Sequence, residues 1–280
     1  MKTISAGLLI AMAASSALAA DMGTPYSKAP APAAYDWSGV YIGGHVGGGW
    51  QDTSFADPGA LPILFNCCVT ISSVNNPGPI SDGRGSSFLG GVQAGWMYQV
   101  ARLVVGADID WSGTRLNSSG ATSLTPADAS GFFANDTYSV RTNWTVTATT
   151  TVGIARDHWL FYGKAGAAFA NDNYGISIAG AGGQFGAATP FAFASSDSQT
   201  VVGWTVGTGV KWAVSDNWFV NAEYDYMDFG TKTPNLSGTF TASPASFGGF
   251  SGNSTFKPSY NQNLSEVKVG LNYKFSGLPF

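Results

Sequence analysis

The stretch Glu266-Val-Lys-Val-Gly-Leu-Asn-Tyr-Lys-Phe275 alternates between two kinds of residue at every step. Successive side chains of a β-strand point to opposite faces, so this segment would have one apolar face and one polar, charged face. Its ten residues match the length that a tilted strand needs to cross a bilayer, and its aromatic end suits the membrane interface. A strand of a soluble β-sandwich has a similar pattern, so the fold depends on whether the pattern recurs with suitable connections.

The same alternation recurs in seven other segments, which together with the tail predict eight strands. These segments cover residues 40–50, 88–99, 103–111, 138–154, 159–169, 202–212 and 218–226. Short turns near Ala101, Asp157 and Asp216 join the second segment to the third, the fourth to the fifth and the sixth to the seventh. The other four connections are long and rich in Gly, Ser, Asn, Pro and Ala, at roughly 51–86, 115–136, 178–197 and 230–258.

The alternation of short and long connections places every short turn at one end of the sheet and every long loop at the other. Short periplasmic turns and long external loops are the layout of outer-membrane barrels. An even number of strands also brings both termini to the short-turn end, where an exported chain starts. The sequence therefore predicts an all-β fold: an eight-stranded antiparallel up-and-down transmembrane β-barrel with short periplasmic turns and four long extracellular loops.

The polarity of the two strand faces separates a membrane barrel from a soluble one, which packs apolar residues inside. Here the apolar faces are large and uncharged, and water would not tolerate a patch of that size on a monomer. We therefore expect these faces to contact lipid and the opposite faces to line the lumen. The charged residues expected in the lumen are Asp108, Asp110, Arg141, Lys164, Lys211, Glu223, Asp225, Glu266 and Lys268.

The interior of an eight-stranded barrel is only wide enough to be filled by side chains. Buried charges must be paired, so these lumen residues predict a structural, salt-bridged plug. The paired carboxylates Asp108/Asp110 and Glu223/Asp225 leave a conducting or catalytic lumen as the alternative.

Composition limits the class of protein further. Charged residues make up 11 % of the chain, against about 25 % in soluble domains. Mean hydropathy is only +0.06, and beyond the N-terminus no apolar run reaches the ~18 residues of a membrane helix. The net charge is −4 and no basic run occurs, so nucleic acid is not an expected partner.

The N-terminus resembles a secretory signal, with Lys2, an apolar segment over 4–14 and small residues at 17–19. The predicted organisation is a signal peptide over 1–19, a Pro/Ala-rich periplasmic linker over 20–36 and the barrel over 37–280. The two cysteines, Cys67 and Cys68, are adjacent and cannot staple distant segments. A vicinal disulfide, an intermolecular link and two free thiols all remain open for them.

No hydrolase or metal-binding motif occurs in the sequence. By alternation His45 faces the lumen, His158 lies in a short turn, and the long loops contain no histidine. We therefore predict that the protein is not an enzyme and has no catalytic, cofactor-binding or metal-binding residues.

Three motifs carry a resemblance to a known family. Residues Trp37-Ser-Gly-Val-Tyr-Ile-Gly-Gly-His-Val-Gly-Gly-Gly-Trp50 resemble the opening strand of the small alphaproteobacterial outer-membrane immunogenic proteins, which belong to the OmpA-like eight-stranded barrels. Phe88-Leu-Gly-Gly-Val-Gln-Ala-Gly-Trp96 and the tail ending at Phe275 are similar to the second and last strands of that family. The resemblance covers the chain from about residue 35.

The resemblance implies localisation in the outer membrane of a Gram-negative cell and a role in envelope integrity and surface contact. The alternative is a small-solute porin, because many such proteins are labelled porins by similarity. Implied partners are outer-membrane lipid and lipopolysaccharide, host or surface ligands of the loops, and the barrel-assembly machinery. The assembly signal would comprise Val267, Val269, Leu271, Tyr273 and Phe275. The extension to Phe280 departs from the family pattern and leaves Phe275 or Phe280 as the terminal aromatic of that signal.

Overall fold

The computed structural model describes residues 35–56, 80–124, 133–182, 189–242 and 250–275. The predictions made for the signal peptide, for most of the linker, for Cys67 and Cys68 and for Phe280 lie outside the described residues. The strands are β1 (Gly39–Ala56), β2 (Gly83–Val100), β3 (Leu103–Leu124), β4 (Phe133–Arg156), β5 (Trp159–Gly182), β6 (Thr189–Ala213), β7 (Trp218–Lys232), β8 (Leu236–Ala242), β9 (Phe250–Phe256) and β10 (Ser259–Phe275). None of the described residues forms a helix that could span a membrane.

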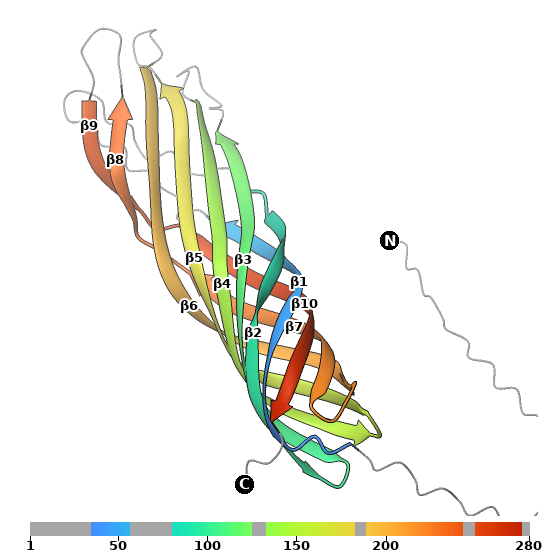
Figure 1. Ribbon diagram of the computed structural model, residues 1–280. Helices are drawn as coiled ribbons and strands as arrows, with labels where there is room; N and C mark the ends of the chain where they lie inside the picture. Colours follow the sequence, from blue (N-terminus) through green and yellow to red (C-terminus); the bar gives the residue numbers. More distant parts are fainter. Residues whose placement is uncertain (1–34, 57–79, 125–132, 183–188, 243–249, 276–280) are drawn as a thin grey trace, which may run out of the picture. The chain divides into compact units, whose positions relative to one another are not determined.

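Eight of these strands close into an antiparallel barrel (Figure 1). Strands β1 to β6 each pair with the next strand along the chain, and β10 lies between β7 and β1. The closing β1–β10 pair runs from Val40↔Phe275 to Ala56↔Ser259. Closure pairs the backbone of every wall strand on both sides, which a sheet needs in order to cross lipid. The predicted eight-stranded up-and-down barrel is confirmed.

The strands run further from the short turns than the sequence pattern predicted. Strands β3 and β4 stay paired out to Leu124↔Ala134, and β5 and β6 out to Gly182↔Thr189. Much of the predicted loops 115–136 and 178–197 is therefore strand. In Figure 1, β3 to β6 continue well past the ends of β1 and β7.

The predicted loop over 230–258 contains the hairpin of β8 and β9. Strand β8 joins the sheet at the far end of β6, where Phe191 is the Cα partner of Ala242. This connection is thus partly ordered as sheet, although the hairpin is not part of the closed barrel wall.

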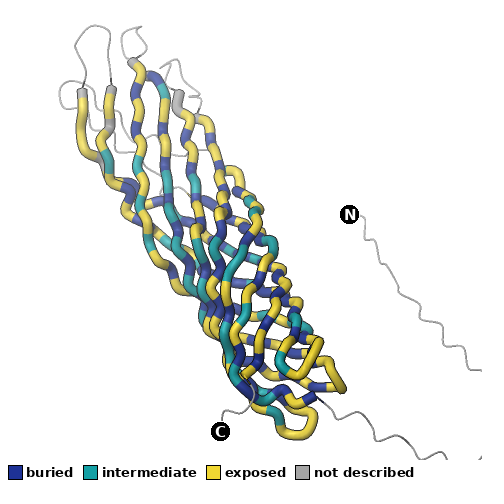
Figure 2. The backbone as a smooth tube through the Cα atoms, viewed as in Figure 1, coloured by how far each residue is buried: buried dark blue, intermediate teal, exposed yellow. Residues whose placement is uncertain are grey.

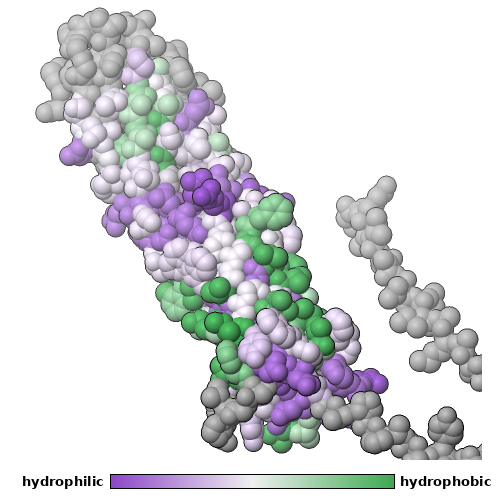
Figure 3. Space-filling view, viewed as in Figure 1, coloured by the Kyte–Doolittle hydropathy of each residue, from purple (hydrophilic) through white to green (hydrophobic). Residues whose placement is uncertain are grey.

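The barrel has two sections that differ in polarity. The membrane section lies between the short turns and an upper boundary marked by Trp50, Phe88, Trp111, Trp144, Phe169, Val202, Tyr226 and Val267, and the outer section comprises the described strand residues beyond them. Outward-facing residues of the membrane section are large and apolar; they include Ile42, Val46, Val92, Ile109, Val152, Phe161, Val206, Val269 and Leu271. Figure 3 shows green, hydrophobic residues gathered over the lower part of the barrel.

In the outer section the exposed positions are mostly small and polar. They include Ser119, Ser123, Asn135, Thr137, Ser177 and Ser198. Many of the buried positions are apolar and form one cluster, which includes Phe55, Tyr138, Tyr174, Ile176, Phe193, Phe256 and Tyr260. Buried and exposed residues alternate along the strands in both sections (Figure 2). Because the chemistry of the two faces is exchanged between the sections, the outer section is built like a soluble barrel.

Irregular pairing near the boundary corrects one predicted lumen residue. On β4, Thr142 and Thr145 are both buried, and Asn143 and Trp144 stand between them without reaching the interior. The pairing of β4 with β5 steps from Thr142 to Trp144 while β5 advances by a single residue. Such a bulge shifts the alternation by one position. Arg141, predicted to face the lumen, is therefore exposed, and the apolar side chains before it turn inward.

Candidate functional site in the barrel lumen

Lys164 lies at the centre of the polar lumen. It projects from β5, is 4 % exposed, and its Nζ lies 2.7 Å from Glu223 Oε2 and 3.1 Å from Asp225 Oδ2. Asp110 Oδ2 is 3.7 Å from the same ammonium group. One cation from β5 therefore contacts carboxylates from β3 and β7, on different parts of the barrel wall.

Lys268 of β10 is the second buried cation of this cluster and is fully buried. Its Nζ lies 2.8 Å from Asp225 Oδ2, 3.7 Å from Asp110 Oδ1 and 3.8 Å from Glu266 Oε2. Asp225 and Asp110 thus stand between Lys164 and Lys268 and bridge them. This arrangement alternates charges of opposite sign and connects four strands through the interior.

Lys211 of β6 lies closer to the short-turn end and is surrounded by aromatic rings. Its Nζ is 3.6 Å from Asp108 Oδ1 and donates a 3.1 Å hydrogen bond to Tyr41 Oη. The same Nζ lies 4.6 Å from the Tyr41 ring centroid and 4.9 Å from that of Tyr162, which is within the range of a cation–π contact. The aromatic rings therefore share the charge of Lys211 with a single carboxylate.

Hydroxyl and amide groups add further hydrogen bonds to the cluster. Tyr41 and Thr151 donate to Asp108, Tyr162 donates to Glu223, and Thr145 Oγ1 donates to Glu266 Oε1 at 3.0 Å. A separate bridge is made by Gln93 Nε2, which donates to Asn221 Oδ1 at 3.0 Å and to Asn272 Oδ1 at 2.6 Å. Charged and polar side chains therefore fill the narrow interior together.

Of the nine predicted lumen charges, eight lie together in this polar cluster and Arg141 does not. The eight comprise five carboxylates and three ammonium groups: Asp108, Asp110, Glu223, Asp225 and Glu266 with Lys164, Lys211 and Lys268. Charges of the two signs are interleaved across the interior rather than stacked as separate rings. Rings of one sign are the arrangement that selects ions in channels.

An apolar layer, here called the lower seal, closes the short-turn end of the lumen. Trp37, which precedes β1, is fully buried, and its ring lies 4.8 Å from Tyr35 and 5.7 Å from Phe219, between centroids. Met97, Leu160 and Tyr162 belong to the same buried cluster. Burial, together with nearby Asp216 and Asp36, raises the pKa of Tyr35 to about 12. The sequence predicted Tyr35 to lie in the linker, whereas it packs against the barrel interior.

The apolar core of the outer section forms the upper seal, on the other side of the polar cluster. Tyr260 lies 4.9 Å from Tyr174 and 5.5 Å from Phe55, and Phe193 lies 4.6 Å from Phe256, all between ring centroids. The polar cluster is thus enclosed between two layers of apolar and aromatic side chains.

Sequence reasoning missed a second buried polar group beneath the upper seal. Thr142 Oγ1 donates to Asp172 Oδ1 at 2.6 Å and lies 3.2 Å from Gln51 Oε1, and Gln262 Nε2 donates to Thr142 Oγ1 at 3.1 Å. Gln51 was predicted as the start of a loop, Asp172 and Gln262 lie between predicted strands and loops, and Thr142 lies inside the predicted strand over 138–154. For Gln51 and Gln262, the sequence signal is the alternation that continues past the predicted strands, to Phe55 on β1 and back from Glu266 on β10.

The lumen contains one buried histidine, and its surroundings bear on catalysis and metal binding. His45 is buried and lies 2.9 Å from Ser112 Oγ through Nε2, but no acid completes a catalytic triad with this pair among the hydrogen bonds found in the described residues. Within the same residues, no group of three or more His, Cys, Asp or Glu side chains is placed to hold a metal ion.

The closed sheet, its exposed apolar band and its packed polar lumen define an integral outer-membrane β-barrel. Residues 6–275 match the family described as "Outer membrane protein beta-barrel domain", and the chain belongs to that family. The protein is accordingly an outer-membrane protein.

Two relatives support this assignment along the whole chain. The 31 kDa outer-membrane immunogenic proteins of Brucella melitensis biotype 1 and Brucella suis biovar 1 are each 28 % identical over 281 residues, which covers 98 % of this chain and 100 % of theirs. Among solved structures, Neisserial surface protein A is 16 % identical and aligns with a TM-score of 0.35 over 85 % of this chain and 98 % of its own. The resemblance stated from the motifs at Trp37, Phe88 and Phe275 is confirmed.

Proposed function

We propose that this protein is a non-catalytic, non-conducting barrel that braces the outer membrane and presents its outer section and loops at the cell exterior. The observation that carries the proposal is the order of layers along the lumen: lower seal, polar cluster, upper seal. An ion would have to cross two apolar layers and displace buried ion pairs, and neither step is compensated by the side chains present.

The pairing pattern of the lumen charges favours a bracing role. The ion pairs join β3, β5, β7 and β10 across the interior. They therefore resist flattening of the barrel cross-section more directly than hydrogen bonds between neighbouring strands do. The outer section favours presentation, because its own apolar core holds the strands together without lipid. The Brucella relatives are named as immunogenic outer-membrane proteins, which agrees with exposure of such a section.

The test is single-channel conductance of the refolded barrel in a planar bilayer. We expect no steps from the wild type. Asp108→Ala/Asp110→Ala removes two lumen carboxylates, and Asp52→Ala/Asp82→Ala removes two exposed ones as the matched control. Heat-modifiable migration on a gel establishes that each variant is folded before it is measured.

Three outcomes are informative. If the wild type shows no conductance steps and only the lumen variant conducts, the proposal is supported and the polar cluster is the barrier to ions. Silence from all three proteins supports it and assigns the barrier to the two seals. Steady, ion-selective steps from the wild type overturn the proposal, and the small-solute channel then replaces it.

A further inference from the structure

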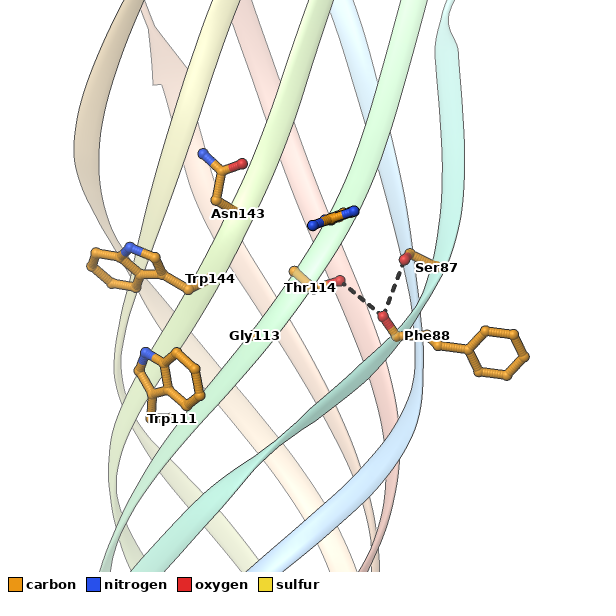
Figure 4. A pocket seen from close by; sticks show the side chains of 8 residues that line it. Ser87, Phe88, Trp111, Gly113, Thr114, Asn143 and Trp144 are labelled. Carbon is orange, nitrogen blue, oxygen red and sulfur yellow. Dashed lines mark hydrogen bonds between the residues drawn. The ribbon is translucent and has the colours of Figure 1, made fainter.

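A recess on the outside of β2, β3 and β4 lies where the membrane section meets the outer section. It has a volume of about 440 Å³ and is lined by Ser87, Phe88, Trp111, Gly113, Thr114, Arg115, Asn143 and Trp144. Figure 4 shows the indoles of Trp111 and Trp144 one above the other, with Asn143 above Trp144 and Phe88 pointing away on the other side of Gly113. The recess faces outward, away from the lumen cluster.

The recess exists because the strand pairing is interrupted there. The ladder between β3 and β4 steps from Gly113↔Trp144 directly to Leu116↔Thr142. Thr114 and Arg115 therefore have no Cα partner on β4. A bulge of this kind bends the strand and redirects its side chains. Gly113 adds to the hollow, because a Cβ at that position would lie 3.2 Å from Cη2 of Trp111.

The floor of the recess is formed by the rings of Trp111 and Trp144, Phe88 lies at its edge, and all three lie at the level of the lipid boundary. Phe88 is 90 % exposed and Trp111 is 46 % exposed, although both are large apolar side chains. Aromatic rings at the ends of the apolar band are typical of the membrane interface, where they lie beside lipid headgroups and the first acyl carbons.

Cationic side chains gather immediately above this floor. The chain has five arginines; Arg102 and Arg156 lie at the short turns, and the other three lie on β2, β3 and β4 as exposed residues at positions 84, 115 and 141. Arg84 pairs with exposed Asp52 at 2.9 Å. Among the described residues no acid lies within ion-pair distance of Arg115 or Arg141.

The register places two of these arginines close together on the same surface. Arg141 is the Cα partner of Asn117, which lies two residues beyond Arg115 on the same face of β3. Asn143 directly precedes Trp144, the partner of Gly113, and donates through Nδ2 to Asn171 Oδ1. The surface therefore combines an aromatic floor with two guanidinium groups that have no acidic partner within the described residues, all at one depth in the membrane.

We propose that this recess binds the phosphorylated headgroup of an outer-leaflet glycolipid of the lipopolysaccharide class. The phosphate would pair with Arg115 and Arg141, because a guanidinium group matches phosphate geometry with two parallel hydrogen bonds. The first acyl carbons would lie over Phe88 and Trp111. The inference goes beyond the proposed function, because a barrel that conducts would have the same outer surface.

The test measures lipid binding to the refolded, full mature barrel in detergent micelles by native mass spectrometry. Purified lipopolysaccharide is titrated in its phosphorylated form and after enzymatic removal of its phosphates. We expect Arg115→Gln/Arg141→Gln to bind the phosphorylated lipid about tenfold more weakly, the loss expected for one good charge-assisted phosphate contact. The dephosphorylated lipid should bind the wild type as weakly as the phosphorylated lipid binds this variant.

Arg102→Gln/Arg156→Gln is the matched control, since it removes the same charge at the opposite end of the strands. It should bind like the wild type. A second variant, Gly113→Val, keeps every charge but fills the hollow beside Trp111, and it should also weaken binding.

Several results would overturn the proposal. Equal affinity of the wild type and Arg115→Gln/Arg141→Gln would mean that these arginines hold no phosphate. An equal loss in the control would indicate only general charge attraction. If inorganic phosphate at millimolar concentration displaced the lipid completely, the recess would be a site for free anions rather than for a lipid.

Discussion

The membrane section and the outer section share the same wall strands but place opposite chemistry on their two faces. In the membrane section, Val206 and Val269 face outward while Lys164 and Asp225 are buried. In the outer section, serine and threonine face outward and rings such as that of Tyr260 are buried. The same alternation of side chains therefore serves two solvents, and what changes is which residue type occupies the odd and even positions.

This difference means that stability has a different source in each section. Burying apolar surface stabilises the outer section, as in any soluble domain. In the membrane section the outward apolar face is stabilised by its transfer from water into lipid, while closure of the backbone ladder and polar pairing hold the interior together. The same kind of substitution should therefore change the free energy of unfolding by different amounts in the two sections.

The largest effect is expected where a buried charge loses its partner. Lys164→Met leaves Glu223, Asp225 and Asp110 without their shared cation in the interior. We expect the free energy of unfolding, measured with denaturant in lipid vesicles, to fall by about 3–5 kcal/mol.

Lys257→Met is the control for this prediction, because Lys257 is exposed in the outer section. Its effect should stay within about 0.5 kcal/mol. If the two variants were equally stable, the lumen ion pairs would not contribute to holding the membrane section together.

A charge on the outward face tests the boundary directly. Val206→Arg places a cation against lipid in the membrane section and should lower the free energy of unfolding by about 2–4 kcal/mol. On the same strand, Ser198→Arg places it in the outer section, where Ser198 is exposed, and should change stability by less than about 0.5 kcal/mol. Similar losses at both sites would remove the distinction between the two sections.

A smaller effect is expected from the removal of one methylene group. Ile176→Val, inside the outer section, should cost about 0.5–1.5 kcal/mol because the packed core cannot refill the gap. Ile154→Val, on the outward face of the membrane section, should cost less, because lipid fills the space beside this 62 % exposed residue. Equilibrium unfolding of both variants in one lipid gives the comparison, and a larger loss for Ile154→Val would contradict it.

A pH-dependent effect is expected at the lower seal. The pKa of Tyr35 is raised from 10.0 to about 12, so the protonated ring stabilises the folded state fully below pH 10, and this contribution is lost as the pH rises towards 12. The wild type should therefore lose stability relative to Tyr35→Phe between these pH values. Parallel unfolding curves of the two proteins at pH 9 and pH 11.5 measure it, and an identical pH dependence would show that Tyr35 is not sealed in.

Most of the membrane section could be predicted from the sequence. Its alternation is strong because lipid requires apolar residues at every outward position, and lumen charges stand out against that background. The short turns were equally readable: Ala101 and Asp157 adopt positive φ angles of 55° and 53°, as tight hairpin turns require. Eight of the nine expected lumen charges lie in the cluster for the same reason.

The outer section was hidden by its composition. Its outward serines, threonines and asparagines are the residues that also mark loops, so β3 to β6 were predicted to end too early. Arg141 was misplaced because alternation alone does not reveal a bulge, and the extra residue at Asn143 reverses the face of everything before it. Tyr35 was assigned to the linker because a single aromatic beside prolines has no periodic pattern.

The position of Lys268 has a consequence for the order of events during assembly. This cation lies on β10, the strand that supplies both free edges of the barrel with their last partner, yet it contacts Asp110 on β3 and Asp225 on β7. Until β10 is in place, those two carboxylates lack one counter-ion and the sheet lacks a closing strand. Pairing of β10 therefore neutralises the interior and removes the open sheet edges in a single event. A chain arrested before this step would expose to lipid both unpaired backbone groups and incompletely paired charges.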